Sequence, residues 1–111
     1  MSIAASGRLA VYEEPNAPFQ IREYPLRAPD AGEVLVRIRM STICRSDIHS
    51  YQGRRPNPCP GVLGHEIIGV IVALGEGVHQ DMRGDPLVPG DRVTWSEYFV
   101  PGSNYTADVL G

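Results

Sequence analysis

The clearest secondary-structure signal in the sequence is the stretch Val34-Leu35-Val36-Arg37-Ile38-Arg39-Met40-Ser41. Its alternation places Val34, Val36, Ile38 and Met40 on one face, and a period of two predicts a β-strand. A second stretch, Ile67-Ile68-Gly69-Val70-Ile71-Val72-Ala73-Leu74, is β-branched and almost continuously apolar. That composition predicts a strand buried on both faces. These two strands form the centre of the fold that we expect.

Shorter β segments are expected around this centre, separated by turns. They cover residues 9–12, 19–24, 91–95 and 97–100, and residues 46–51 could form a helical turn capped by Ser46 or Asp47. The chain has 12 glycines and 10 prolines. Residues 52–61 are therefore interpreted as a loop, and residues 75–77 as a turn in which glycine supplies a positive φ. Strands at this spacing favour a mainly β domain, a small barrel or a sandwich.

Length and charge exclude several classes of protein. A chain of 111 residues suits a single domain, 1–111, and 42% hydrophobic with 21% charged residues is close to the globular average. The net charge is −3. The sequence shows no basic stripe, so nucleic-acid binding is not expected. No apolar run is long enough to span a bilayer, so no membrane partner is expected. The N-terminus lacks a secretory pattern, which predicts a cytoplasmic protein with reduced cysteines.

Two short motifs flank the central strands. Cys44-Arg45-Ser46-Asp47-Ile48-His49 follows the first strand, and Gly64-His65-Glu66 opens the second. Neighbouring strand ends could bring the sulfur of Cys44 and a nitrogen of His65 to one metal, and zinc takes such ligands. Asp47 could accept the second N–H of His65 and fix its orientation. Glu66 could be an extra ligand or a nearby charge.

Each of these residues also has an ordinary interpretation. A lone cysteine is most often a small buried hydrophobe, and a lone histidine is more often surface or hydrogen-bonded core than ligand. Cys59 could be a third ligand if its loop folds back, but an incidental loop thiol is the simpler interpretation. Arg54 and Arg55 could meet an anion, although solvation is the ordinary state of such side chains. The segment 75–77 begins like a dinucleotide fingerprint but lacks the third glycine.

Taken in order, these motifs resemble a known family. The pattern GEVLVRI, C-R-S-D-I-H, P-G-V-L-G-H-E-I-I-G-V-I and V-P-G-D-R-V is similar to the N-terminal, GroES-like domain of the medium-chain, zinc-dependent alcohol dehydrogenases, from about Gly7 to Val93. The resemblance implies a partly open GroES-like β-barrel with one or two short helical turns. It also implies zinc, NAD or NADP as the hydride carrier, a small alcohol or aldehyde as substrate, and a homo-oligomer when full length.

The resemblance implies metal-binding roles for three residues. Cys44 and His65 are similar to two of the catalytic zinc ligands of the family. Glu66 is similar to the adjacent carboxylate, which can bind the metal in some states, and Asp47 to the partner that orients His65.

The resemblance further implies a proton path and a cofactor contact. Ser46 is similar to the hydroxyl that takes the alcohol proton, and His49 to the relay that passes the proton toward solvent. Arg45 is similar to the residue that contacts the cofactor pyrophosphate. Four positions look architectural: Gly64, Gly69, Gly90 and Asp91.

The chain also departs from the family pattern. The family's third zinc ligand and its Rossmann domain come from sequence beyond this chain, and the four-cysteine lobe of a structural zinc is not found after Val93. We therefore expect a truncated domain that does not turn over alone. A non-catalytic module that binds zinc or a partner stays open as the alternative. A zinc-free quinone reductase relative would typically lack Cys44 and His65, and a co-chaperonin rests on fold analogy alone.

Overall fold

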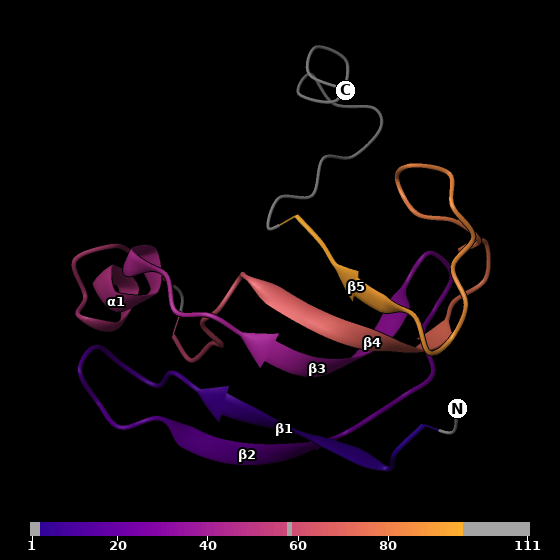
Figure 1. Ribbon diagram of the computed structural model, residues 1–111. Helices are drawn as coiled ribbons and strands as arrows, with labels where there is room; N and C mark the ends of the chain where they lie inside the picture. Colours follow the sequence, from indigo (N-terminus) through magenta and orange to yellow (C-terminus); the bar gives the residue numbers. More distant parts are fainter. Residues whose placement is uncertain (1–2, 58, 97–111) are drawn as a thin grey trace.

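The described residues form a mainly β fold with one short helix (Figure 1). A computed structural model describes residues 3–57 and 59–96. Along the chain the elements are β1 (Ser6–Val11), β2 (Gln20–Pro25), β3 (Val34–Ser41), α1 (Arg45–Tyr51), β4 (Ile67–Leu74) and β5 (Arg92–Thr94). The bounds predicted for the two central strands are confirmed. The strand predicted at 97–100 lies outside the described residues.

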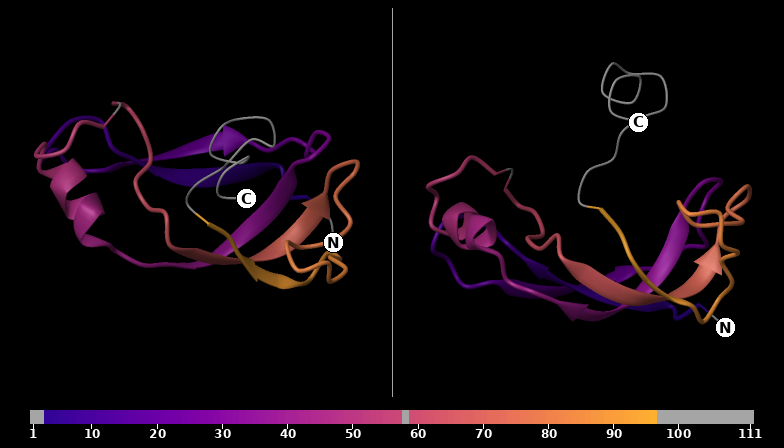
Figure 2. Two further views of the ribbon diagram at one scale, coloured as in Figure 1. Left: turned by 90° about the horizontal axis from the view of Figure 1, so that it is seen from above. Right: turned by 45° about the horizontal axis from the view of Figure 1, so that its top comes forward.

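The strands make two antiparallel sheets. One contains β1 and β2, and the other has the order β3-β4-β5. The helix α1 and the segment after it lie at the end of the molecule where β1 and β3 finish and β4 starts (Figure 1). The loop between β4 and β5 lies at the opposite end, an arrangement that the further views also show (Figure 2). Within the described part of the chain, the two sheets stay open and do not close into a barrel.

The pairing of β3 with β4 sets the geometry of the larger sheet. The register runs from Val34 opposite Leu74 to Ser41 opposite Ile67, with two irregularities on the way, one that skips Val72 in β4 and one that skips Arg39 in β3. The strands approach closely at Gly69, where an added Cβ would lie 2.8 Å from the carbonyl oxygen of Arg37. Glycine at this position therefore permits the observed sheet.

The most buried side chains lie in the middle of β4 and at the end of β1. Ile71 has no exposed surface, and Val72, Val11 and Tyr12 are also buried. The start of β4 is different, because Ile68 keeps 41% of its surface exposed. The expectation that β4 is buried on both faces is therefore correct only for its centre.

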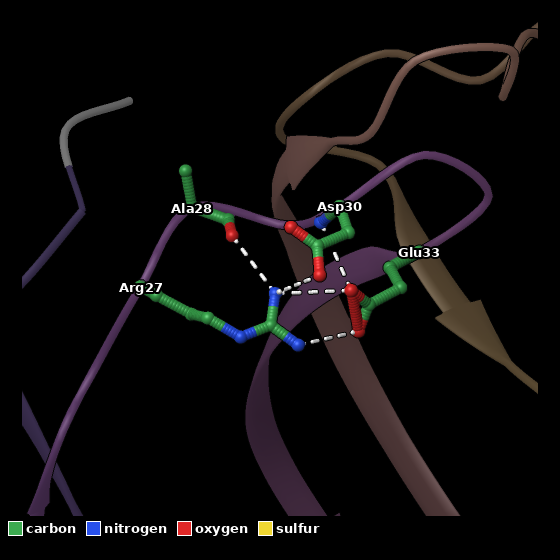
Figure 3. Close-up of polar contacts among 4 residues, drawn as sticks. All are labelled: Arg27, Ala28, Asp30 and Glu33. Atoms are coloured by element: carbon green, nitrogen blue, oxygen red, sulfur yellow. Dashed lines mark hydrogen bonds and ion pairs between the residues drawn. The ribbon is translucent and has the colours of Figure 1, made fainter.

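A polar cluster orders the turn before β3 (Figure 3). The Arg27 guanidinium donates to both carboxylate oxygens of Glu33, each at 3.0 Å, and Glu33 also accepts the backbone N–H of Asp30 at 2.9 Å. These hydrogen bonds, first of all that from Arg27, lower the pKa of Glu33 below its ordinary value of 4.5. The cluster fixes the turn from which β3 begins.

No helix among the described residues is long and apolar enough to cross a bilayer.

Candidate metal centre

Two paired strand ends bring the motifs together. Ser41 at the end of β3 pairs with Ile67 at the start of β4. The ladder continues one step further, because the N–H of Thr42 donates to the carbonyl oxygen of Glu66 at 3.0 Å. Gly64 has a φ of 113°, a conformation that L side chains rarely adopt, just before the His65-Glu66 pair. Adjacent strand ends thus place Cys44 and His65 at one edge, as the sequence predicts.

The cap of α1 differs from the prediction. The helix begins at Arg45, so Cys44 is its N-cap, and neither Ser46 nor Asp47 caps it. Asp47 is the third helical residue, and its Oδ2 accepts the backbone N–H of Cys44 at 3.0 Å. This is the carboxylate half of a capping box. Cysteine is an uncommon cap residue, so sequence preferences place the start of this helix too late.

Three potential metal ligands form a compact cluster. The donor atoms of Cys44, His65 and Glu66 all lie within 4.8 Å of one another. The Nε2 of His65 is 4.0 Å from Oε1 of Glu66, whereas its Nδ1 lies 3.3 Å from Oδ1 of Asp47. The imidazole therefore points Nε2 toward the cluster and turns Nδ1 toward a carboxylate. A carboxylate behind a histidine is the usual way in which a metal-binding imidazole is oriented.

The environment of Cys44 favours its thiolate. Hydrogen bonds from the hydroxyl and then the backbone N–H of Ser46, followed by one with His65, lower the pKa of the Cys44 thiol. Desolvation and the negative charge of Glu66 oppose this effect but are smaller. The thiolate is the form of cysteine that binds metals, so the site stabilises the state that a ligand needs.

These donors fit zinc. A sulfur, an imidazole nitrogen and a carboxylate oxygen are its common protein ligands, and bonds of about 2.0–2.3 Å place tetrahedral donors roughly 3.5 Å apart. The observed donor atoms all lie within 4.8 Å of one another, which exceeds that spacing by little more than about 1 Å. The side chains are also partly accessible, since Cys44 and His65 are half-buried and Glu66 is exposed. The cluster can therefore hold zinc with room for a further ligand.

A polar cleft of about 450 Å³ opens beside the cluster. Ser46 and Asp47 line it together with Cys44 and His65. Arg45 is exposed at the first position of α1. His49, one turn further along α1, is half-buried and is not among the described residues that line the cleft.

The structure does not bring Cys59 into the cluster. Its side chain is exposed, and its sulfur contacts the carbonyl oxygen of Asn57 at 3.5 Å. Among the described residues, the metal-binding group consists of the other three donors alone. The possibility that the loop folds back to supply Cys59 as a third ligand is therefore not realised in this structure.

Ser50 of α1 also lines the cleft. So do four residues of the following loop that sequence patterns did not place there, including Arg55, which was considered only as a possible anion contact: Arg55, Asn57, Val62 and Leu63. They belong to a Gly- and Pro-rich stretch with no periodicity. Loop geometry of this kind depends on tertiary contacts, so no local signal could assign them.

Comparison with known proteins agrees with the fold. The family model of the alcohol dehydrogenase GroES-like domain matches residues 30–111. The chain belongs to this family. It is 38% identical over 85 residues to an alcohol dehydrogenase class-3 of Zea mays. The matched region covers 74% of this chain and 22% of that protein.

Solved structures share the same fold. An alcohol dehydrogenase from Thermotoga maritima superposes with a TM-score of 0.86 at 30% identity, over 96% of this chain and 29% of that one. A protein from E. coli CFT073, described as a short chain alcohol dehydrogenase complexed with NADH, gives a TM-score of 0.77 at 35% identity, with the same coverage. The chain thus spans between a fifth and a third of the length of these relatives. The mainly β, GroES-like fold is confirmed.

Proposed function

We propose that this chain supplies the zinc-binding and proton-relay half of an alcohol or aldehyde hydride-transfer site in a zinc-dependent oxidoreductase. The observation that carries this proposal is the convergence of Cys44, His65 and Glu66 within 4.8 Å at paired strand ends. Membership of the alcohol dehydrogenase GroES-like domain family supports it. When bound, zinc supplies a Lewis acid and the nicotinamide a hydride acceptor.

In this proposal the chain's own residues hold the ion and orient its ligands. Cys44 and His65 bind it directly, and Glu66 is close enough to bind it as well. Asp47 has two tasks, since one oxygen faces the His65 ring and the other accepts the Cys44 N–H. Both primary ligands are thereby fixed by a single carboxylate.

Two residues of α1 would move the proton that the alcohol releases. Ser46 lines the cleft and its side chain hydrogen-bonds Cys44. In this proposal its hydroxyl takes the proton. His49 lies three residues further along the helix, and residues three apart share a helix face. An imidazole can accept and release protons near neutral pH, which suits the last step toward solvent.

The cofactor and the remaining ligand would come from a further domain. The E. coli relative is complexed with NADH, and we propose NAD or NADP for this protein, with Arg45 contacting its pyrophosphate. A third protein ligand for zinc would be supplied from that domain. We further propose a cytoplasmic location and a homo-oligomeric full-length protein.

Zinc stoichiometry tests the metal site directly. We expect the Cys44→Ser variant to lose zinc affinity by more than about 100-fold, because outer partners alone contribute roughly 10- to 100-fold. Cys59→Ser is the matched control, since that thiol is exposed and outside the cluster. Zinc per chain would be measured by elemental analysis after titration with a competing chelator, and alcohol-dependent NAD(P)H formation by absorbance. Full zinc occupancy and activity in Cys44→Ser would contradict the proposal.

The intact mass of the protein made by its host distinguishes the enzyme from the alternative. The chain alone has a mass of 12.1 kDa, and we interpret residues 1–111 as one GroES-like domain. A native mass roughly three to four times larger, as the 29% coverage of relatives implies, would fit the dehydrogenase. A native mass near 12.1 kDa that retains one zinc would favour a non-catalytic metal- or partner-binding module.

A further inference from the structure

Arg55 forms part of the wall of the cleft beside the metal cluster. It lines the same cleft as Cys44, Ser46 and His65, although it lies beyond the end of α1. Its side chain is exposed, and a guanidinium stays protonated at all ordinary pH values. A molecule that reaches the metal ligands through this cleft therefore meets a fixed positive charge.

Backbone hydrogen bonds on both sides of Arg55 hold its segment in place. The N–H of Arg54 donates to the carbonyl oxygen of His49 at 2.9 Å, which ties the segment to α1. Further along, Gly61 and Tyr12 exchange backbone hydrogen bonds of 2.9 and 2.7 Å, which ties it to the end of β1. The entropic cost of presenting the guanidinium is therefore mainly that of its own side chain.

The carboxylates next to the cleft are already engaged with other groups. Asp47 uses Oδ2 on the backbone N–H of Cys44 and turns Oδ1 toward His65. Glu66 faces the Nε2 of His65. Within the described part of the chain, no ion pair joins Arg55 to a carboxylate. Its fork of N–H donors is thus available to a ligand, and such forks match carboxylate and phosphate oxygens.

We infer that the substrate of this site carries an anionic group, a carboxylate or a phosphate, which Arg55 binds while the hydroxyl or carbonyl end reaches the metal ligands. This inference rests on the proposed function for the reacting end of the substrate. It adds a substrate class, an alcohol or aldehyde with a negative charge at a distance from the reacting carbon, and it makes Arg55 a specificity-determining residue.

The test compares charged and neutral ligands of the same shape. The native zinc-loaded protein would be titrated calorimetrically with a series of ω-hydroxy carboxylic acids of increasing chain length, with their primary amides, and with hydroxyalkyl phosphates. The variants are Arg55→Gln, Arg55→Lys, and Arg54→Gln as the matched control, because Arg54 is exposed but is not among the described residues that line the cleft. Thermal unfolding of each variant checks that the fold is intact.

We expect the best acid to bind about tenfold or more tightly than its amide, the size of a charge-assisted hydrogen bond. Arg55→Gln should abolish this preference, Arg55→Lys should keep part of it, and Arg54→Gln should leave it unchanged. A preference for phosphates over acids would identify the anion as a phosphate.

Other results would overturn the inference. Equal binding of acid and amide by the unsubstituted protein would do so, as would no binding of either or a preference that survives in Arg55→Gln. Weaker NADH binding by Arg55→Gln with an unchanged acid-to-amide ratio would place Arg55 on the cofactor instead. Arg55-dependent binding without hydride transfer to NAD or NADP would contradict only the proposed function.

Discussion

The substitution Asp47→Asn tests how the proposed metal ligands Cys44 and His65 are held. Asp47 contacts both proposed ligands, with Oδ1 3.3 Å from Nδ1 of His65 and Oδ2 3.0 Å from the backbone nitrogen of Cys44. Asparagine keeps the shape but replaces one oxygen with a donor NH₂. When Nε2 of His65 binds a metal, Nδ1 carries the proton and donates, so whichever way the amide is turned, a donor then faces a donor. Either the His65 contact or the Cys44 contact is lost.

The expected effect follows from the contact that is lost. An amide nitrogen facing His65 favours the tautomer with the proton on Nε2, the atom that faces the cluster, and so opposes metal binding. Loss of such an outer partner weakens metal affinity by about 10- to 100-fold, or roughly 1.4–2.7 kcal/mol. The opposite orientation removes the carboxylate half of the capping box instead, which should lower the unfolding free energy by about 0.5–2 kcal/mol with or without metal.

Two assays separate these outcomes. Zinc affinity is measured by competition with a chelator, and chemical unfolding is measured with zinc and after chelation. Asp81→Asn is the control, because Asp81 also accepts backbone N–H groups but lies in the loop between β4 and β5. If Asp47→Asn bound zinc within twofold of the unsubstituted protein and unfolded identically, the role given to Asp47 would be refuted.

Two further predictions concern the sheet and the turn before it. Gly69→Ala should lower the unfolding free energy by about 1–3 kcal/mol, because the new Cβ would meet Val36 and, at 2.8 Å, the carbonyl oxygen of Arg37. If denaturant unfolding gave this variant the same stability as the unsubstituted protein, the sheet would be able to relax and the prediction would be wrong. Glu33→Gln should destabilise the fold at neutral pH, because the Arg27 hydrogen bonds lower the pKa of Glu33 in the folded state. That contribution is present above the unfolded-state pKa and is lost as pH falls through the lowered folded-state value, below 4.5. Unfolding curves across this range should therefore converge at low pH, and a gap independent of pH would contradict the assignment.

The two central strands were predictable from sequence because their apolar patterns are long and regular. Gly32 and Gly64 lie just before β3 and β4, and Gly75 directly follows β4, so periodicity and turn residues agree at these ends. The first strand was predicted to begin at Leu9, whereas in the structure β1 begins at Ser6. Its first residues, Ser6, Gly7 and Arg8, have no apolar pattern and are recruited by pairing with β2. Such tertiary pairing is invisible to a local pattern.

The site was predictable to the extent that it depends on topology. Antiparallel neighbours necessarily put the end of one strand beside the start of the next, so Cys44 and His65 could be brought together from their positions alone. The residue at the helix cap and the cleft residue Arg55 could not be placed in this way. Their positions depend on where α1 begins and on how the segment after it is tied to Tyr12.

The irregular pairing of β3 with β4 has a consequence for the metal. The two primary donors stand at the ends of two strands that can in principle slide along each other, and a slip of two residues would carry His65 about 7 Å past Cys44. That displacement exceeds the 4.8 Å spread of the observed donors, so only one alignment of the strands offers a complete set. An ion bound by these donors would favour the observed register over every shifted one. Metal binding at the end of the β3-β4 ladder would thereby also stabilise the two irregularities after Leu35 and Ile38.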